Sequence, residues 1–150
     1  MALKAQLEND LKAALLGGDR FVSDVLRNFK AVILNEEVAQ GKRDTGLDDA
    51  TIEKLLAREV KKRNESATLY DDADRKELAD NERAELKVLA AYLPEQLSEE
   101  AIKTAVDAAV SATGASTPAD MGKVIGMVKG KLGNAADGAT VARLVKEALA

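Results

Sequence analysis

Residues 20–40, RFVSDVLRNFKAVILNEEVAQ, carry the clearest periodicity in the chain. Their large apolar side chains recur at steps of three and four, the spacing that places residues on one face of an α-helix. The residues expected on this face are Phe21, Val22, Val25, Leu26, Phe29, Val32 and Ile33. The charged residues Arg27, Lys30, Glu36 and Glu37 are expected off the face. The stretch therefore predicts an amphipathic helix with both phenylalanines buried.

The same spacing extends from this stretch in both directions. Upstream, residues 2–16 predict a helix with a stripe of leucines and Ala14, ended by a pair of glycines. Downstream, residues 41–47 predict a polar loop, and an aspartate at 48 or 49 can cap a third helix running to about residue 70. A fourth helix is expected over about 75–92 and should form an antiparallel hairpin with the third. The stripe residues expected to face inward include Leu3, Leu7, Leu11 and Leu15 in the first helix and Leu78, Leu86, Leu89 and Leu93 in the fourth.

Charged residues of the expected hairpin leave several interpretations open. Asp71-Asp72-Ala73-Asp74 lacks the central glycine and closing glutamate of a calcium loop and is interpreted as a turn and N-cap. Glu59 and Arg63 fall inside the apolar sector of the third helix. They are interpreted either as an ion pair at the rim of the core or as a pair that faces a partner. The side of this helix opposite the apolar sector carries three further cations, Lys54, Arg58 and Lys61. They are either ordinary solvated surface or a second basic contact for a partner.

The helical pattern is interrupted at residues 93–97, LPEQL, because the residue before a proline is biased away from helix. We place a boundary here, between an N-terminal helical domain of about four helices (1–95) and a small C-terminal three-helix bundle (96–150). Ser98 can cap the next helix, which should run to about Thr113. Aromatic residues make up only 3% of the chain, and alanine, leucine and valine dominate its apolar content. The predicted fold class is all-α.

The composition excludes several kinds of chemistry. The sequence contains no cysteine and no histidine, so disulfides, thiol catalysis, Cys/His zinc sites and a Ser-His-Asp triad are excluded. We predict no catalytic residue, no metal and no cofactor. The charged start does not resemble a signal peptide, and no run of about 18 apolar residues predicts a membrane span. A cytoplasmic protein without a membrane partner is expected.

Residues 117–150, TPADMGKVIGMVKGKLGNAADGATVARLVKEALA, hold a local excess of positive charge. The whole chain has a net charge of −4, whereas residues 115–150 carry five basic and three acidic side chains, a net of +2. Thr117-Pro118 and a nearby acid predict the start of a helix. Glycines recur inside it at Gly122, Gly126 and Gly130. Each interior glycine costs about 1 kcal/mol relative to alanine, so a compensating role for this repeat is expected.

A helical projection places the glycine stripe about 140° from the centre of the apolar sector, at 100° per residue. Lys123 and Lys129 flank the stripe, an arrangement suited to phosphate groups approaching bare backbone. The spacing is equally compatible with a helix that ends before Gly130, with a stripe covered by another helix of the chain, or with a partner helix docked there. After the turn at residues 134–138, a last helix is expected, with Arg143 and Lys146 outward beside Glu147.

The chain resembles the YqeY-like proteins, relatives of the tail domain of the B subunit of the tRNA-dependent Asp/Glu amidotransferase. The resemblance spans nearly the whole length. The stretches that carry it are Leu26-Arg27 with Asn35-Glu36, REVKKR at 58–63, YLPEQL at 92–97, DMGKV at 120–124, and Asp137-Gly138 followed by Val141, Leu144 and Val145. The family usually has a Gly-Arg pair after its third helix, where this chain has Asp74-Arg75.

The resemblance implies an all-helical protein with an N-terminal helical region and a C-terminal three-helix bundle that contacts tRNA or another structured RNA. The nucleic-acid-binding residues it implies are Gly122, Lys123, Gly126, Lys129, Lys131, Arg143 and Lys146. By kinship, such proteins are assigned carbon–nitrogen ligase activity with glutamine as amido donor, although the chemistry belongs to other domains and subunits. We therefore predict a non-catalytic RNA-binding accessory module. The alternatives are a helical protein–protein adaptor and a component of a ligase assembly.

Overall fold

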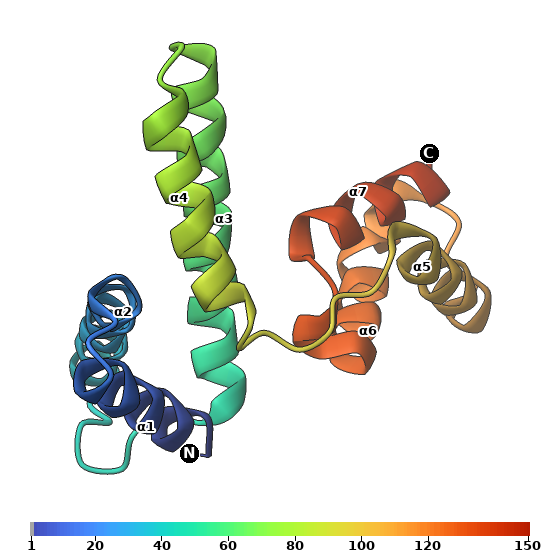
Figure 1. Ribbon diagram of the computed structural model, residues 1–150. Helices are drawn as coiled ribbons and strands as arrows, with labels where there is room; N and C mark the ends of the chain where they lie inside the picture. Colours follow the sequence, from blue (N-terminus) through green and yellow to red (C-terminus); the bar gives the residue numbers. More distant parts are fainter. Residues whose placement is uncertain (1) are drawn as a thin grey trace. The chain divides into compact units, whose positions relative to one another are not determined.

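The computed structural model describes residues 2–150, which form seven α-helices and two short 3-10 turns and contain no strand (Figure 1). The predicted all-α class is confirmed. Contacts divide the chain into two compact units, Met1–Leu93 and Pro94–Ala150. We call them the N-terminal and the C-terminal unit.

The N-terminal unit consists of two helix pairs. The helices are α1 (Ala2–Leu16), α2 (Arg20–Ala39), α3 (Asp49–Asp72) and α4 (Lys76–Ala90). Side-chain caps define two of the starts, because Asp19 accepts the backbone N–H of Val22 at 3.1 Å and Asp48 accepts that of Thr51 at 2.8 Å. The observed helix ends lie within two residues of those expected from the apolar spacing.

The core of the N-terminal unit includes one residue that the polar-loop prediction missed. Leu47, in the loop before α3, is fully buried, as is Ile52 in the first turns of that helix. With Asp48 at the N-cap, these two residues occupy the positions of a hydrophobic staple, in which apolar side chains on either side of the cap pack together. The staple fixes the direction in which the chain enters α3.

Two expectations for α2 were wrong. Phe21 is 39% exposed, because it lies in the first turn of the helix, at the edge of the buried face that Phe29 and Ile33 occupy. Glu37 is only 2% exposed, because it follows Ile33 by four residues and so continues that buried face. Its carboxylate accepts both hydrogen bonds from the Lys4 ammonium, at 3.0 and 3.1 Å, which offsets the cost of burying the charge.

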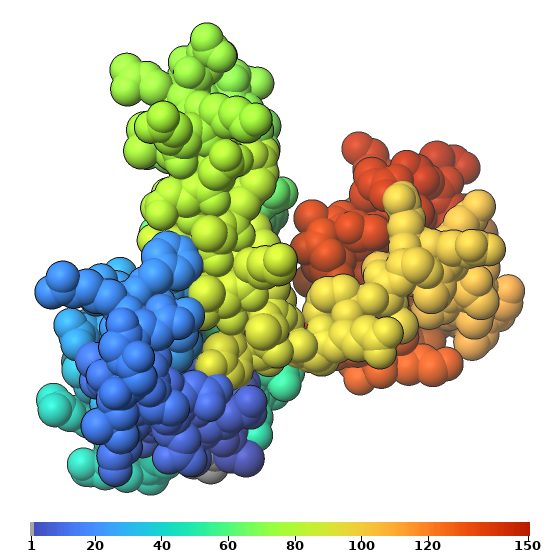
Figure 2. All heavy atoms as spheres, viewed as in Figure 1, coloured from blue at the N-terminus to red at the C-terminus, as the bar shows by residue number. Residues whose placement is uncertain are grey.

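Helices α3 and α4 form the expected antiparallel hairpin, whose turn end extends past α1 and α2 (Figures 1 and 2). Near that end only small side chains are buried, Ala67 on α3 and Ala79 on α4. Leu78 was expected inward but is 43% exposed, and Leu15 at the end of α1 is also exposed. Both lie where no further helix is available to cover a large side chain. A two-helix segment is too thin to bury leucines on more than one face.

Polar contacts tie the hairpin together and close its base. Arg63 of α3 bridges Glu59 at 2.7 Å and Glu85 of α4 at 3.3 Å, all three being largely buried. This is the ion pair that the sequence allowed at the rim of the core, and Glu85 adds a second carboxylate to it. At the base, the Tyr92 hydroxyl donates to the Asp10 carboxylate at 2.6 Å and joins the end of α4 to α1. Burial and this bond raise the pKa of Tyr92.

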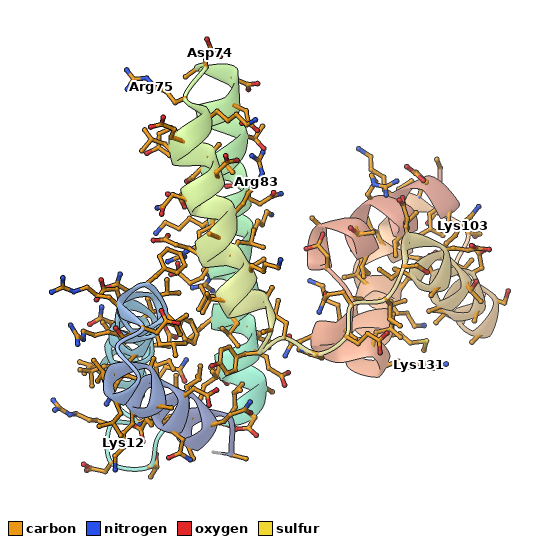
Figure 3. All side chains as sticks on the ribbon, in the orientation of Figure 1. Lys12, Asp74, Arg75, Arg83, Lys103 and Lys131 are labelled. Carbon is orange, nitrogen blue, oxygen red and sulfur yellow. The ribbon has the colours of Figure 1, made fainter. Side chains whose placement is uncertain are left out.

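The turn of the hairpin differs from the expected cap. Helix α4 begins after Arg75, whose side chain makes no capping bond, so none of the preceding aspartates is its N-cap. Asp74 has a φ of +59°, in the left-handed region where glycine is usual. Asp71 instead pairs with Arg83 across the hairpin, and this hydrogen bond lowers the pKa of Asp71. Figure 3 shows Asp74 and Arg75 at the turn and Arg83 farther along α4.

The C-terminal unit is a three-helix bundle in which each helix contacts the other two. Its elements are α5 (Glu99–Thr113), the 3-10 turn η1 (Pro118–Asp120), α6 (Met121–Leu132), the 3-10 turn η2 (Gly133–Ala135) and α7 (Gly138–Ala148). Ser98 caps α5 as expected, accepting the backbone N–H of Ala101 at 3.1 Å. The buried core consists of Ile102, Val106, Ala109, Val124, Val128, Val141, Leu144, Val145 and Leu149.

Candidate nucleic-acid interface

Helix α6 is positioned by the capping box of the preceding turn η1 and by its own buried face. The Asp120 carboxylate accepts the backbone N–H groups of Ser116 at 3.1 Å and Thr117 at 3.3 Å. These bonds lower the pKa of Asp120, and the nearby Lys123 ammonium adds to the effect. On the inner side, Val124 and Val128 are fully buried. Met121, Ile125 and Leu132 pack against the same core and are half-buried, whereas the side that carries the glycines is exposed.

The glycine stripe of α6 is open. A Cβ atom built on Gly122, Gly126 or Gly130 would meet no heavy atom within 4 Å. Because α6 continues to Leu132, Gly130 lies inside the helix and not beyond its end. A helix that ends before Gly130 is therefore wrong, and no helix of the C-terminal unit covers the stripe.

Helix α6 carries three lysines, of which Lys123 and Lys129 flank the open stripe. Lys123, Lys129 and Lys131 are all exposed, and none forms an ion pair with another described residue. The side chain of Lys129 leans toward the start of α7, where its Nζ lies 3.5 Å from the position of a Cβ on Gly138. Lys131 projects from the last turn of α6 (Figure 3).

The two cations of α7 differ in their surroundings. Lys146 is exposed and makes no ion pair with a described residue. Arg143 is held by two carboxylates, Glu147 at 3.1 Å on its own helix and Glu99 at the start of α5. Its guanidinium is thus partly neutralised, unlike the ammonium groups of the lysines.

Comparison with known proteins places the chain in a family. The family model described as YqeY-like protein matches residues 4–149. The chain belongs to the YqeY-like protein family.

Two curated relatives of this YqeY-like chain carry the name "Altered inheritance of mitochondria protein 41, mitochondrial". The one from Vanderwaltozyma polyspora is 32% identical over 87 residues, which cover 58% of this chain and 46% of the relative. The one from Eremothecium gossypii is 31% identical over 89 residues, which cover 59% of this chain and 48% of the relative. The match thus spans about half the length of each relative.

The open face of α6 in this YqeY-like chain also contains an apolar side chain that the sequence projection did not single out. Met127 is 44% exposed and adjoins Gly126. The spacing could have found it, because a helical projection places Met127 outside the sector of Val124 and Val128. A flexible thioether beside bare backbone suits an apolar contact as well as a polar one.

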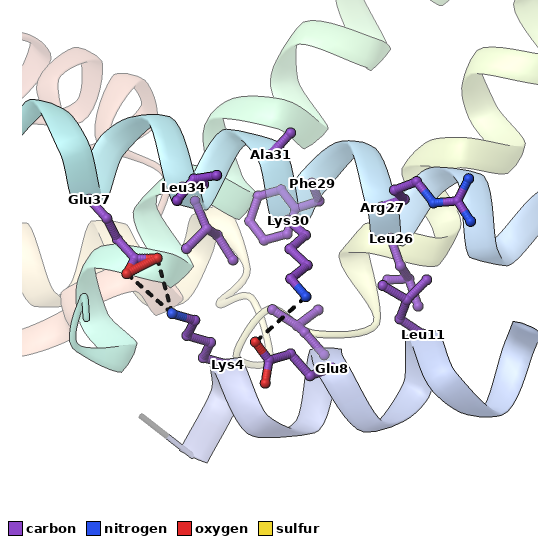
Figure 4. A pocket seen from close by; sticks show the side chains of 12 residues that line it. Lys4, Glu8, Leu11, Leu26, Arg27, Phe29, Lys30, Ala31, Leu34 and Glu37 are labelled. Atoms are coloured by element: carbon purple, nitrogen blue, oxygen red, sulfur yellow. Dashed lines mark hydrogen bonds and ion pairs between the residues drawn. The ribbon is translucent and has the colours of Figure 1, made fainter. Parts of the chain in front are cut away.

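A second concave feature of this YqeY-like chain lies in the N-terminal unit, between α1 and α2 (Figure 4). It has a volume of about 300 Å³ and an apolar lining that includes Leu7, Leu11, Leu26, Phe29, Ile33 and Leu34. The Lys4–Glu37 pair borders it, and Lys30 and Glu8 face each other across it at 3.9 Å. Among residues 2–150, no three potential metal-ligating side chains gather, and no helix is long and apolar enough to cross a membrane.

Proposed function

We propose that this YqeY-like protein is a non-catalytic accessory module that binds tRNA or another structured RNA through the open face of α6. Its place of action is the cytoplasm or another compartment that contains tRNA. The RNA phosphates approach the backbone at Gly126 and meet the ammonium groups of Lys123 and Lys129 on either side. Lys131 and Lys146 extend the same positive surface.

The observation that carries this proposal is the uncovered glycine stripe. Gly122, Gly126 and Gly130 weaken the helix, and no side chain of the C-terminal unit fills the space above them. Exposed lysines without acidic partners border that space in a protein whose net charge is −4. An anionic partner gains both close approach and charge from this arrangement. The kinship of the family with an amidotransferase tail is consistent with tRNA as that partner.

The decisive experiment is a charge reversal on both sides of the stripe. The full chain carrying Lys123→Glu and Lys129→Glu is compared with the wild type for binding of total tRNA, by filter binding over a range of salt. Because two phosphates are then no longer neutralised, the log–log slope should fall by about 1.4–1.8. We expect this fall together with an unchanged helical circular dichroism spectrum.

A matched control separates a local site from net charge. Lys12→Glu with Lys103→Glu makes the same change in charge at exposed lysines of two other helices, α1 and α5. This control should reduce affinity only slightly. Wild-type affinity and slope in the α6 variant would rule out the proposed interface.

A protein–protein adaptor is the second candidate, and Met127 is the observation that favours it. A helix of a partner could pack on the glycines with its apolar side chains against Met127. In that case Gly126→Leu abolishes capture of the partner, and salt has little effect. The third possibility, a component of a carbon–nitrogen ligase assembly, predicts amide formation by the purified chain with mischarged tRNA, glutamine and ATP.

A further inference from the structure

The outward side of α3 carries four cations without acidic partners. They are Lys54, Arg58, Lys61 and Lys62, and we call them the α3 cation stripe. All four are exposed, and none forms an ion pair with another described residue. The stripe extends over nine residues, so its first and last residues lie about 12 Å apart along the helix axis.

The next basic residue along the helix shows what a structural cation looks like here. Arg63 follows Lys62 directly but points to the opposite side of α3, where it bridges Glu59 and Glu85. Its guanidinium serves the contact between α3 and α4. The stripe residues have no such structural role, because they lie outside the buried side of α3. That side is formed by Ile52, Leu55, Leu56 and Ala67.

The stripe also works against the stability of its own helix. Lys54 and Arg58, and Arg58 and Lys62, are four residues apart, and like charges at that spacing destabilise a helix. One acid, Glu65, follows on the same side, and it forms no ion pair with the stripe. Residues 1–93 carry 16 basic and 19 acidic side chains, a net charge of −3. The absence of ion pairs at the stripe is therefore not due to a shortage of acidic side chains in this unit.

We propose that the α3 cation stripe is a second contact for the phosphate backbone of the RNA that binds α6. This inference rests on the proposed function and assigns the N-terminal unit a part in it. Both contacts are on one chain, so engagement of one raises the effective concentration of RNA at the other. Two modest surfaces thereby give a tight and strongly salt-dependent complex.

A nucleic acid fits the stripe better than a membrane surface does. A helix that lies on a membrane needs an apolar face beside its cations. The apolar face of α3 is buried in the core of the N-terminal unit. Beside the stripe, Leu69 is a single exposed apolar side chain and does not form an apolar face, and the other neighbours are small or polar, such as Ala57 and Asn64. Phosphates of a polynucleotide need only the row of charges.

The test neutralises the four cations of the stripe in the full chain and measures binding of total tRNA as a function of salt concentration. The stripe variant carries Lys54→Gln, Arg58→Gln, Lys61→Gln and Lys62→Gln. We expect its log–log slope to fall by about 3, at roughly 0.7–0.9 for each phosphate that the variant no longer binds. Removal of the like-charge pairs should leave the urea midpoint unchanged or higher, which shows that the fold is intact.

A matched control and the α6 charge reversal make each outcome decisive. The control carries four exposed lysines changed to glutamine elsewhere in the N-terminal unit: Lys12, Lys42, Lys76 and Lys87. A slope that falls in the stripe variant and stays near wild type in the control supports the inference. An equal fall in both, or none in the stripe variant, overturns it.

The remaining outcomes separate the inference from the proposed function. Weaker binding in the α6 variant with no change in the stripe variant leaves the α6 interface standing and removes the α3 contact. The reverse result removes the α6 interface and keeps the α3 contact. Binding of the wild type to anionic phospholipid vesicles, but not to tRNA, overturns both.

Discussion

Gly126→Ala is the sharpest perturbation of the α6 face, because it adds one methyl group at the centre of the open stripe. The added Cβ would meet no heavy atom within 4 Å, so no steric cost opposes the change. Gly126 lies in the interior of a 12-residue helix, where backbone freedom is already lost in the folded state. The substitution therefore removes the entropic cost of glycine without disturbing a contact.

The expected gain is close to the full difference in helix propensity between the two residues. An interior Gly-to-Ala change stabilises a helix by about 0.8–1.0 kcal/mol. Gly122 and Gly130 lie in the first and last turns of α6, where we expect about half as much each. Together the three changes should stabilise the C-terminal unit by roughly 2 kcal/mol, a large part of a typical margin of about 5–15 kcal/mol.

Native-state hydrogen exchange suits this measurement, because it reports on one unit of a chain that consists of two. The amides of Val124 and Val128 lie in the buried core of the C-terminal unit and should exchange through its unfolding. A gain of about 1 kcal/mol slows their exchange roughly fivefold. The same variant should bind total tRNA more weakly, because the methyl group stands where the phosphate backbone approaches.

The control for this prediction is a glycine at the end of the same helix. Gly133 has a φ of +56°, so alanine there is strained and should destabilise the unit by about 1 kcal/mol. Faster exchange in Gly126→Ala would refute the reasoning, because it would mean that something covers the stripe. If that loss of stability grew with protein concentration, the cover would be a second copy of the chain.

Three further substitutions test the N-terminal unit. Asp74→Gly should stabilise the hairpin by about 0.5 kcal/mol in urea unfolding, because glycine adopts a positive φ without strain. Tyr92→Phe should cost about 1–2 kcal/mol by losing the bond to Asp10. Since the pKa of Tyr92 is raised in the folded state, this contribution is fully present below the ordinary tyrosine pKa of about 10 and is lost as the pH rises through the raised value. Lys4→Met should cost about 3 kcal/mol by leaving the buried Glu37 carboxylate without a cation, and Glu37→Met in the same chain should recover most of it, as a double-mutant cycle would show.

The helices could be predicted from the sequence because their signals are local. Apolar residues at steps of three and four, glycines after helix ends and Asp or Ser at N-caps act within a few residues. The cap of Asp48 and the cap of Ser98 both appear where these signals placed them. The same local signals could also have found Leu47, because an apolar residue directly before an N-cap is typical of a hydrophobic staple.

The errors arise where burial depends on residues far away in the chain. Leu78 and Ala79 are neighbours in sequence, and only the close approach of α3 decides that the alanine is inside. Spacing from Ile33 places Glu37 on the buried face, but a charge is tolerated there only because Lys4, 33 residues earlier, pairs with it. Likewise, spacing indicates that Arg143 lies beside Glu147, but its second partner Glu99 comes from the start of another helix.

The sequence predicted which side of α6 the glycines occupy, but not whether that side is exposed. A helical projection of α6 separates the glycine stripe from Val124 and Val128, and the structure confirms that both valines are buried. Whether a neighbouring helix covers the stripe depends on how three helices pack, which the periodicity of one helix does not encode. The structure answers this question within the described residues.

The two surfaces assigned to RNA reduce stability for different physical reasons, and salt separates them. The cost of Gly126 is entropic and does not depend on ionic strength. The cost of the α3 cation stripe is repulsion between exposed charges, which is screened when the Debye length falls from about 10 Å at 0.1 M salt to about 3 Å at 1 M. The advantage of the stripe variant in urea unfolding should therefore shrink in 1 M salt, whereas that of Gly126→Ala should persist. If the extra stability of the stripe variant is unchanged in 1 M salt, it comes from helix propensity. Repulsion between the stripe cations would then not reduce the stability of α3.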